Sequence, residues 1–498
     1  MSRTLLAVPL IGPSVEEALA TLNEQNRLFD VAEIRMDLIA AFRDRTACEA
    51  APDLRRLLTP RPCPVIVTNR PTRQGGSWSG DEGRRLDLLA EADALGADYI
   101  DIELDALPRF RRRGHARLIV SHHNFQETPH NLPEIAQQIE GTNADVVKVV
   151  TMARSLADNL AVLRVLRDAR KPTIALTMGE HGHVARILGP KFGAFLVFAS
   201  AGAGRESAPG QVPARDLVDL YRFRETGPDT RLYGVVANPV AHSMSPAIHN
   251  AAFRHCGVDA VYLPFRVDRV AEFIPAWRDL PMDGYSVTIP HKEAVMPLLG
   301  EVEPLARRIG AVNTIVHRDG RLCGSNTDWA AAVKAIESGL PQGASLRGRT
   351  VLLLGAGGAS RAIAFGLAEA GSRVVIANRT VERAVRLAAD VGCESIDLAE
   401  VAALPYDILV NGTSVGMHPH VDATPMEGPL LRPGSLVFDS VYNPLETRLL
   451  REAREAGCRT VDGLAMFVNQ AAAQFELWTG VPAPRELMRA VVEARLKR

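Results

Sequence analysis

The sequence lacks the features that mark secreted, membrane-spanning and metal-stabilised proteins. Its 498 residues contain only six cysteines, which are dispersed without a Cys-x-x-Cys pair. We therefore expect free thiols in a reducing compartment and no structural zinc. No apolar run approaches the roughly 18 residues of a membrane span, and the N-terminus enters a strand-like segment without a charged and then apolar leader. These absences predict a cytoplasmic protein.

The sequence also lacks an excess of charge of either sign. The formal net charge is −1, and charged residues make up 23% of the chain. This balance gives no electrostatic reason to bind nucleic acid or an anionic membrane, so neither is an expected partner. The length is too great for one hydrophobic core and predicts about three domains.

The first 200 residues contain a series of short apolar runs that are rich in β-branched residues. There are eight of them: Leu5–Leu10, Val31–Leu38, Val65–Arg70, Tyr99–Leu104, Leu118–His123, Val146–Met152, Thr173–Met178 and Phe195–Ser200. Helical patterns fill most of the gaps, and one of them begins with a capping box of Ser14 and Glu17. Strands alternating with helices predict a (β/α)8 TIM barrel over residues 1–225, although the connection 105–117 is short for a full helix.

The run Val146–Met152 is unusual because Lys148 lies among four valines. A charged and unpaired lysine on a strand that is buried on both faces costs several kcal/mol, which favours the neutral amine that attacks carbonyl groups. A single lysine near a strand end more often extends its ammonium group to solvent.

The ends of the neighbouring strands favour the functional interpretation of Lys148. They carry the polar residues Glu33, Arg35, Asp37, Arg70, Glu103, His122 and His123. In a barrel these residues all meet at the C-terminal rim, where such folds place their active sites. The Gly-, Ala- and Ser-rich segment 199–211 is either a lid over this rim or a plain surface loop.

A second set of polar residues follows a polar linker over residues 226–231. Ser243 and Ser245 precede a proline, so they either cap a helix or present two hydroxyls to a polyol. Further along the chain, two strands end near polar groups, which are Thr288, Lys292, Asn313 and Asp328. Lys292 and Asp328 form a candidate acid/base pair, because a nearby carboxylate positions an ammonium group and supports its charge.

Residues 350–362 have the pattern of strand, glycine turn and helix that binds dinucleotides. Gly355, Gly357 and Gly358 form the turn, and a helix from Ala359 would present its N-terminus to a pyrophosphate. Ser360 stands where the third glycine or alanine is usual.

The end of the next strand indicates which dinucleotide binds. An NAD enzyme carries Asp or Glu about 20 residues after the glycine turn, to bind the ribose hydroxyl. This sequence instead has Asn378, Arg379 and Thr380, with Arg383 one helical turn further. Two arginines suit the 2′-phosphate of NADP. The alternative is that Arg379 is an exposed arginine without a ligand.

The motifs of the first half resemble type I 3-dehydroquinate dehydratase over almost all of residues 1–225. The matching segments are 33–37, 101–104, 121–125, 184–189 and 207–211, together with Lys148. The resemblance implies that Lys148 forms a Schiff base with the substrate ketone, that His123 is the acid/base, and that Glu103 orients this histidine. It also implies a set of substrate-binding residues: Arg186 for the carboxylate, and Glu33, Arg35, Arg70, Ser207 and Gln211 for the hydroxyls.

The motifs of the second half resemble shikimate dehydrogenase over residues 231–498, and include the segments 411–414, 439–442 and 462–470. The resemblance implies a substrate lobe over 232–330, completed by about 464–498, and a Rossmann NADP-binding lobe over 331–463. Lys292 and Asp328 become the catalytic dyad. The implied substrate contacts are Ser243, Ser245, Thr288, Asn313, Tyr442 and Gln470, and Thr413, Gly463 and Met466 join the cofactor contacts.

The two resemblances together predict a bifunctional enzyme of the shikimate pathway. It would dehydrate 3-dehydroquinate to 3-dehydroshikimate and reduce that product to shikimate with NADPH, without a metal. One alternative is a second half that oxidises quinate or shikimate with NAD, which Arg379 and the absent acidic residue oppose. Another is a degenerate regulator that only senses metabolites, which the intact Lys148, His123, Lys292 and Asp328 oppose.

Overall fold

The computed structural model describes residues 3–24, 28–202, 204–241, 243–280 and 282–497. Contacts divide the chain into two compact units. The first consists of Met1–Arg231, Asp259–Val267 and Pro275–Leu280, and the second of Leu232–Val258, Asp268–Ile274 and Pro281–Arg498. None of the described helices is long and apolar enough to span a lipid bilayer.

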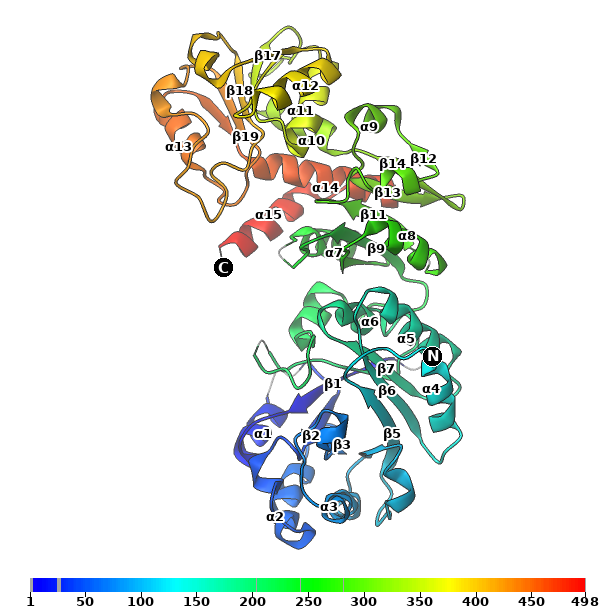
Figure 1. Ribbon diagram of the computed structural model, residues 1–498. Helices are drawn as coiled ribbons and strands as arrows, with labels where there is room; N and C mark the ends of the chain where they lie inside the picture. Colours follow the sequence, from blue (N-terminus) through cyan, green and yellow to red (C-terminus); the bar gives the residue numbers. More distant parts are fainter. Residues whose placement is uncertain (1–2, 25–27, 203, 242, 281, 498) are drawn as a thin grey trace. The chain divides into compact units, whose positions relative to one another are not determined.

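Eight parallel strands form a nearly closed barrel in the first unit (Figure 1), which confirms the predicted fold. They are β1 (Leu5–Leu10), β2 (Val31–Arg35), β3 (Val65–Thr68), β4 (Tyr99–Glu103), β5 (Arg117–Asn124), β6 (Val146–Met152), β7 (Thr173–Met178) and β8 (Leu196–Phe198). Their order is β7-β6-β5-β4-β3-β2-β1-β8. Across the remaining gap, the N–H of Phe195 donates to the carbonyl of Thr173 at 2.8 Å.

Six α-helices connect the barrel strands: α1 (Val15–Leu22), α2 (Ala47–Leu58), α3 (Glu82–Ala94), α4 (Leu132–Glu140), α5 (Ala157–Asp168) and α6 (His183–Leu188). The short connection between β4 and β5 contains only the 3-10 turn Leu107–Arg109. Ser14 caps α1 by accepting a hydrogen bond from the N–H of Glu17 at 3.2 Å, which is half of the predicted capping box.

Side-chain alternation along β6 positions the barrel site. Six of its seven residues are buried, as expected for a strand between helices and the barrel interior. Lys148 and Val150 line the interior cavity. Because neighbouring side chains of a strand point to opposite faces, Val147 and Val149 face the surrounding helices.

The chain continues into a mixed six-stranded sheet. Its strands are β9 (Arg231–Ala237), β10 (Ala260–Arg266), β11 (Met282–Val287), β12 (Glu301–Val302), β13 (Thr314–Arg318) and β14 (Arg321–Ser325), in the order β10-β9-β11-β13-β14-β12. Strand β13 runs antiparallel to both β11 and β14. The helices of this part are α7 (Ser245–His255), α8 (Val270–Ala276) and α9 (Pro304–Ile309).

The third sheet is parallel throughout and has the Rossmann order β17-β16-β15-β18-β19-β20. Its strands are β15 (Thr350–Leu354), β16 (Arg373–Ala377), β17 (Glu394–Ile396), β18 (Ile408–Asn411), β19 (Leu436–Asp439) and β20 (Arg459–Val461). The accompanying helices are α10 (Asp328–Ser338), α11 (Gly358–Glu369), α12 (Val381–Val391) and α13 (Arg448–Glu455). The last two helices, α14 (Gly463–Thr479) and α15 (Arg485–Leu496), return to the mixed sheet and contact α7.

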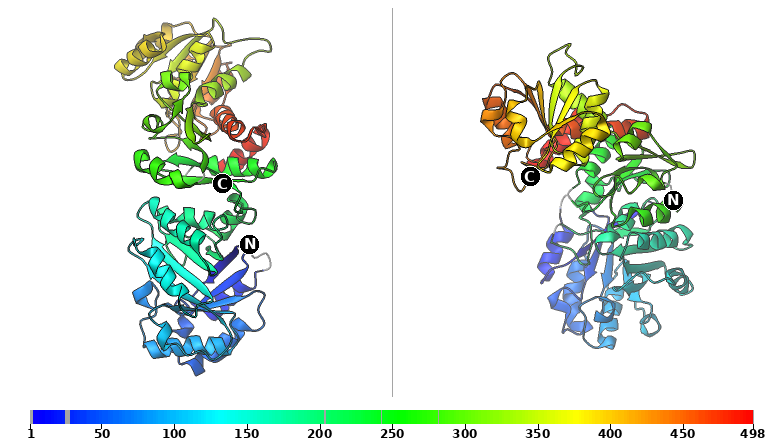
Figure 2. Two further views of the ribbon diagram at one scale, coloured as in Figure 1. Left: turned by 90° about the vertical axis from the view of Figure 1, so that its right-hand side faces the viewer. Right: turned by 45° about the horizontal axis from the view of Figure 1, so that its top comes forward.

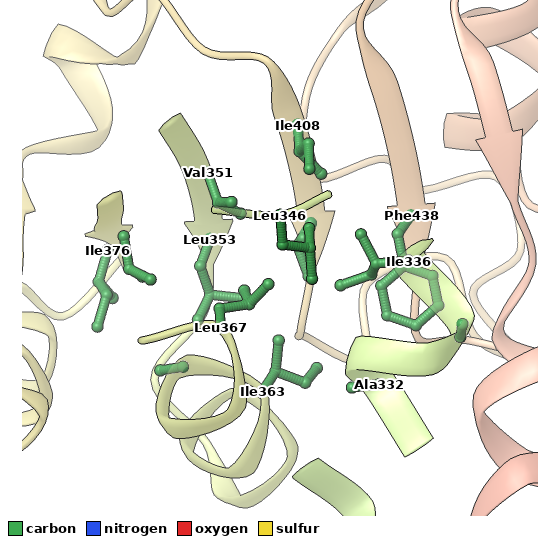
Figure 3. Close-up of a cluster of buried hydrophobic side chains, with 14 of the residues drawn as sticks. Ala332, Ile336, Leu346, Val351, Leu353, Ile363, Leu367, Ile376, Ile408 and Phe438 are labelled. Atoms are coloured by element: carbon green, nitrogen blue, oxygen red, sulfur yellow. The ribbon is translucent and has the colours of Figure 1, made fainter. Parts of the chain in front are cut away.

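Helices pack on both faces of this third sheet (Figure 2). Val351 and Leu353 of β15 belong to a buried cluster with Ile363 and Leu367 of α11 (Figure 3), whereas the intervening Leu352 packs on the α13 side. This core fixes α11 directly behind the glycine turn. The order of the strands reverses between β15 and β18, so the loops after these two strands diverge and leave a crevice for a ligand.

Candidate functional sites

A cavity of about 50 Å³ lies at the C-terminal ends of the barrel strands. Eight residues that the sequence predicts as functional line it: Glu33, Arg35, Arg70, His123, Lys148, Arg186, Ser207 and Gln211. Gln74, Phe125 and Phe198 also line it, and the sequence did not single them out.

Lys148 is buried in this cavity and does not extend to solvent, since only 4% of the residue is exposed. Its Nζ donates a hydrogen bond to Asp101 Oδ2 at 2.7 Å and lies 3.7 Å from Glu33 Oε1. It also lies 4.3 Å from the centre of the Phe198 ring. The lysine is therefore buried but not unpaired, because Asp101 holds it by a hydrogen bond and Glu33 lies within ion-pair distance.

Asp101 is the ionic centre of the barrel site. Besides Lys148, it accepts hydrogen bonds from Ser121 Oγ at 2.6 Å and forms an ion pair with Arg70 Nη2 at 2.7 Å. Burial opposes ionisation of this carboxyl, but the charges of Arg70 and Lys148 outweigh it and hold its pKa well below the usual range. Sequence reasoning missed Asp101, although its spacing of two from Glu103 puts both carboxylates on one face of β4.

Glu103 lies beneath the cavity between two arginines. Its carboxylate is 2.6 Å from Arg70 Nη1 and 2.7 Å from Arg85 Nη2, and Arg85 is held in turn by Glu82 at 2.8 Å. Among the described residues, Glu103 makes no hydrogen bond to His123. That Glu103 orients His123 stays a prediction, and any such effect would pass through Arg70.

The two adjacent histidines point to different places, as strand alternation predicts. His123 lines the barrel cavity, whereas His122 lines a separate hollow with Asp105 and Gln138. In the cavity, His123 contacts Gln74. The Oε1 atom of Gln74 lies 3.4 Å from Nδ1 of His123 and accepts a hydrogen bond from the backbone N–H of His123 at 3.2 Å. A carbonyl acceptor at Nδ1 favours the tautomer in which Nε2 is free to accept a proton.

The electrostatic surroundings keep His123 neutral. Burial lowers its pKa well below the usual 6.5, and the nearby charges of Arg70 and Lys148 lower it further, against the opposing effect of Asp101. The cavity thus combines a primary amine with an imidazole in its basic form.

Arg186 is the buried cation of this cavity that lacks an acidic partner among the described residues. The Nη1 of Arg186 donates to the carbonyl of Phe198 at 3.0 Å, and its Nε has no hydrogen-bond partner among the described residues. Burial lowers the pKa of this guanidinium to about 10. Arg35, in contrast, is held by Asp37 through two hydrogen bonds of 2.9 and 2.7 Å. A buried, uncompensated guanidinium is costly, so this position suits a bound anion.

Ser207, Ala208 and Gln211, from the loop after β8, line the cavity. The side chain of Gln211 accepts from the N–H of Ser207 at 2.8 Å and donates to its hydroxyl at 3.1 Å. Gly210 has φ +74°, and a Cβ there would lie 2.2 Å from the carbonyl oxygen of Gly179. Only glycine allows this close packing on the loop after β7, so the end of the segment is fixed beside the cavity, and its role as a lid stays a prediction.

A second cavity of about 350 Å³ lies in the second unit, between the mixed sheet and the Rossmann sheet. The predicted residues that line it are Ser243, Ser245, Thr288, Lys292, Asn313, Asp328, Ala359, Tyr442, Gly463, Met466 and Gln470. Ser286, Phe467 and Gln474 also line it and were not predicted.

A charged pair stands at the centre of the second cavity. Lys292 Nζ donates to Asp328 Oδ2 at 2.6 Å, and Asn313 Nδ2 donates to the other carboxylate oxygen at 2.8 Å. Asn313 is itself held, because its Oδ1 accepts from the N–H of Thr327 at 2.8 Å. Asp328 is also the first residue of α10, where the helix dipole favours a negative charge. The carboxylate therefore fixes the amino group of Lys292 at the wall of the cavity.

Hydroxyl groups surround this pair. Ser243 Oγ accepts from the N–H of Ser245 at 3.3 Å, so one hydroxyl supports the start of α7 while both serines line the cavity. Tyr442 stacks on Phe467 with ring centres 4.5 Å apart. Burial raises the pKa of Tyr442, so its hydroxyl stays a neutral donor.

The glycine turn after β15 has an open cradle. A Cβ added at Gly357 or Gly358 would meet no heavy atom within 4 Å, although Gly357 is the N-cap of α11 and Gly358 its first residue. Gly355 has φ +110°, and a Cβ there would lie 2.7 Å from the Thr413 side chain. Ser360 is buried and donates to the carbonyl of Gly412 at 2.8 Å, so it ties the turn to the loop after β18. The backbone N–H groups of the turn are accessible to a pyrophosphate.

Arg379 and Arg383 are exposed just beyond β16, and neither forms an ion pair within the described part of the chain. Asn378 donates to the carbonyl of Thr380 at 2.9 Å, which shapes the turn between them. The same part of the chain contains no group of three or more His, Cys, Asp or Glu side chains that could hold a metal ion.

Family models match both parts of the chain. The type I 3-dehydroquinase model matches residues 6–228. The shikimate dehydrogenase substrate binding domain matches 235–315, the shikimate / quinate 5-dehydrogenase model 338–430, and the shikimate 5′-dehydrogenase C-terminal domain 463–493.

Individual proteins are similar either to the whole chain or to its second part. The chloroplastic bifunctional 3-dehydroquinate dehydratase/shikimate dehydrogenase of Arabidopsis thaliana is 43% identical over 508 residues, which cover 97% of this chain and 83% of that protein. A shikimate dehydrogenase (NADP(+)) of Bacillus cereus strain B4264 is 45% identical over 53% of this chain and 99% of its own length. A solved shikimate dehydrogenase in complex with NADP+ is 37% identical with a TM-score of 0.52, over 55% of this chain and 98% of that one.

The barrel geometry predicts that the His123 ring titrates well below pH 6.5. A histidine whose pKa is lowered by folding stays neutral as the pH falls through 6.5, and it disfavours the folded state once the unfolded chain takes up a proton there. Nuclear magnetic resonance titration of the imidazole signals, assigned with the variants His123→Gln and His122→Gln, measures this pKa.

The matched variant for this titration is Gln74→Glu, which places a carboxylate beside Nδ1 at nearly constant shape. It should raise the pKa of His123, because an opposite charge at hydrogen-bond distance favours the imidazolium. A wild-type midpoint at or above 6.5, or a variant without an upward shift, would contradict the electrostatic account of this site.

Proposed function

The chain belongs to the family of bifunctional 3-dehydroquinate dehydratase/shikimate dehydrogenases, and we infer from this membership how its residues share the two reactions. The barrel is a 3-dehydroquinate dehydratase, and the remainder is an NADP-dependent shikimate dehydrogenase. The product of the first reaction is the substrate of the second. We assign residues 1–225 to the barrel, 226–231 to the linker, 232–330 with about 464–498 to the substrate lobe, and 331–463 to the NADP lobe.

One observation carries the assignment of the barrel residues: a primary amine, a neutral imidazole and an unpaired guanidinium meet in a single cavity. The Lys148 amine adds to the ketone of 3-dehydroquinate, and loss of water gives an iminium. The iminium acidifies the adjacent C–H, and His123 Nε2 removes that proton. The same imidazolium then protonates the departing hydroxyl, which leaves as water, and hydrolysis of the iminium frees Lys148. Asp101 positions Nζ and stabilises the positive iminium.

The substrate carboxylate fits Arg186. Its guanidinium is buried without an acidic partner among the described residues, and a carboxylate would supply both the missing charge and the missing acceptors. Ser207 and Gln211 of the lid would bind the hydroxyls, together with Glu33. Arg35 and Arg70 line the cavity but are held by carboxylates, so we assign them to its electrostatics as well as to substrate contact.

The Schiff-base role of Lys148 predicts a covalent adduct. Borohydride added with 3-dehydroquinate should reduce the iminium and attach the substrate skeleton to a peptide that contains Lys148, as measured by mass spectrometry. Lys148→Ala should abolish formation of the enone, while reduction of 3-dehydroshikimate stays near the wild-type rate because that site contains none of the barrel residues.

Lys171→Ala is the matched control for this experiment. Lys171 precedes β7 at the opposite end of the barrel, where its Nζ donates to the carbonyls of Thr142 and Ala144 at 3.0 Å. This variant should still form the adduct. An adduct on another lysine, or none during turnover, would refute the assignment of Lys148.

In the second unit, Lys292 and Asp328 form the acid/base dyad. The ammonium group of Lys292 donates a proton to the ketone oxygen of 3-dehydroshikimate as this oxygen becomes a hydroxyl, and Asp328 holds the ammonium in place. NADPH supplies the hydride when it is bound. Ser243, Ser245, Thr288 and Gln470 line the same cavity with groups that hydrogen-bond the ring hydroxyls and the carboxylate.

The residues of the nucleotide lobe fit NADP. The open turn of Gly357 and Gly358 at the start of α11 suits a pyrophosphate. Arg379 and Arg383 offer two exposed guanidinium groups to the 2′-phosphate. Asn378 occupies the position of the acidic residue of NAD enzymes, whose negative charge would repel this phosphate. The same arginines oppose the alternative of quinate oxidation with NAD.

Arg379→Ala should raise the Michaelis constant for NADPH about tenfold to a hundredfold, because a charge-assisted hydrogen bond contributes about 1.5–3 kcal/mol. The constant for NADH should change little. Initial rates of 3-dehydroshikimate reduction with each cofactor measure both values.

The matched control is Arg373→Ala, at the start of the same strand, where the arginine pairs with Glu394 at 2.8 Å and faces no ligand. It should leave the preference for NADPH unchanged. A wild-type enzyme that uses both cofactors equally well, or an Arg379 variant that keeps its preference, would contradict this assignment.

We also propose a cytoplasmic location and three specific small-molecule substrates, 3-dehydroquinate, 3-dehydroshikimate and shikimate. The six cysteines are all free, which fits a reducing compartment. The Arabidopsis relative is described as chloroplastic.

A further inference from the structure

The substrate lobe and the nucleotide lobe of the second unit are joined by a contact next to the glycine turn. Arg361 of α11 donates through Nε to the carbonyl of Ile309 and through Nη2 to the carbonyl of Arg308 at 3.3 Å. Its Nη1 pairs with Asp390 of α12 at 2.6 Å. One guanidinium therefore ties the last carbonyls of α9 to two helices of the Rossmann lobe. Free carbonyls at a helix C-terminus favour a cation there.

An apolar centre lies beneath this polar contact. Phe365 of α11 is 2% exposed and packs with Ile309 and Ala311 from the substrate lobe. The guanidinium carbons of Arg361 and Arg308 lie 5.4 and 5.6 Å from the centre of its ring. Arg308 also pairs with Glu369 at the end of α11, at 2.5 Å.

The position of this contact links the two halves of the reaction site. Arg361 lies three residues after Gly358, in the first turn of the helix whose N-terminus faces the expected pyrophosphate. On the other side, Ile309 precedes Asn313 by four residues, and Asn313 holds Asp328. The intervening Val312 donates its N–H to the carbonyl of Lys292 at 2.8 Å. A shift of α9 against α11 would therefore move Lys292 and Asn313 relative to the glycine turn.

We propose that Arg361 is a positioning residue that sets the separation of the two lobes, and thereby the distance that the hydride crosses. The proposal rests on the assignment of NADPH-dependent ketone reduction to this unit. Arginine is required because three N–H groups in one plane reach two carbonyls and a carboxylate together, whereas the single ammonium of a lysine cannot.

The test separates positioning from binding. In Arg361→Ala, kcat for 3-dehydroshikimate reduction should fall about tenfold to a hundredfold, because small displacements of reacting atoms are costly. The dissociation constants of NADPH alone and of shikimate alone, measured by fluorescence and calorimetry, should stay within about twofold of the wild-type values. A twofold change corresponds to less than about 0.5 kcal/mol of binding free energy. Arg361→Lys should not restore kcat. In the ligand-free protein, backbone amides of residues 304–313 should exchange hydrogen for deuterium faster than in the wild type.

The matched control is Arg448→Ala. Arg448 also makes three contacts, to Glu452 at 2.5 Å, Glu427 at 2.6 Å and the carbonyl of Asp422 at 3.1 Å, but all of them lie within the nucleotide lobe. It should leave kcat and exchange at 304–313 unchanged. Should Arg361→Ala fail to fold, the exposed Arg308→Ala should give a weaker form of the same pattern.

Three outcomes would overturn the proposal: an unchanged kcat, a loss of binary affinity that equals the loss of kcat, or full rescue by lysine. Failure of the proposed function is distinguishable, because a wild-type enzyme that does not reduce 3-dehydroshikimate would refute that function while the exchange experiment still reports on the contact.

Discussion

The buried carboxylate of Asp101 is the interaction on which the barrel site depends. It holds Lys148 at 2.7 Å and Arg70 at the same distance, and Arg70 continues to Glu103 and then to Arg85. Alternating charges let this group of ions stay buried, whereas removal of one partner from such a pair costs about 3–5 kcal/mol. The arrangement leaves only Arg186 without an acidic partner among the described residues of the cavity, so the site is poised for an anionic substrate. It also surrounds His123 with cations, which keeps the imidazole in its basic form.

The second unit also holds its reactive lysine with a carboxylate, but at a site between two lobes. Its charged pair, Lys292 and Asp328, is fixed by the neutral amide of Asn313, whose own hydrogen bonds leave it no freedom to turn. The barrel carries Asp101, His123 and Lys148 on strands of one sheet, so the register of these strands sets the distances among them. The reductase site lies between two lobes, so its geometry also depends on a contact such as that of Arg361 with α9.

Much of this arrangement follows from the sequence because it depends on local patterns. Short β-branched runs predict the barrel strands, strand alternation separates His123 from His122, and the glycine turn before α11 predicts the nucleotide site. The rest depends on contacts between distant segments. Asp101 becomes the partner of Lys148 only when β4 and β6 lie on either side of β5 in the sheet. Gln74 reaches His123 from 49 positions away. Ser360 lies in the dinucleotide motif, yet its hydroxyl is buried against Gly412, a contact that no motif reveals.

The most direct test of the whole account is an assay that follows both reactions in one cuvette. The protein is supplied first with 3-dehydroquinate alone, and the absorbance of the conjugated enone is recorded; NADPH is then added and its oxidation is followed at a separate wavelength. The account predicts that the enone forms without any cofactor, and that it then disappears as NADPH is oxidised in equal amount. An enone that forms only in the presence of NADPH, or one that persists while NADPH is left unoxidised, would contradict the assignment of two consecutive reactions to the two units of this chain.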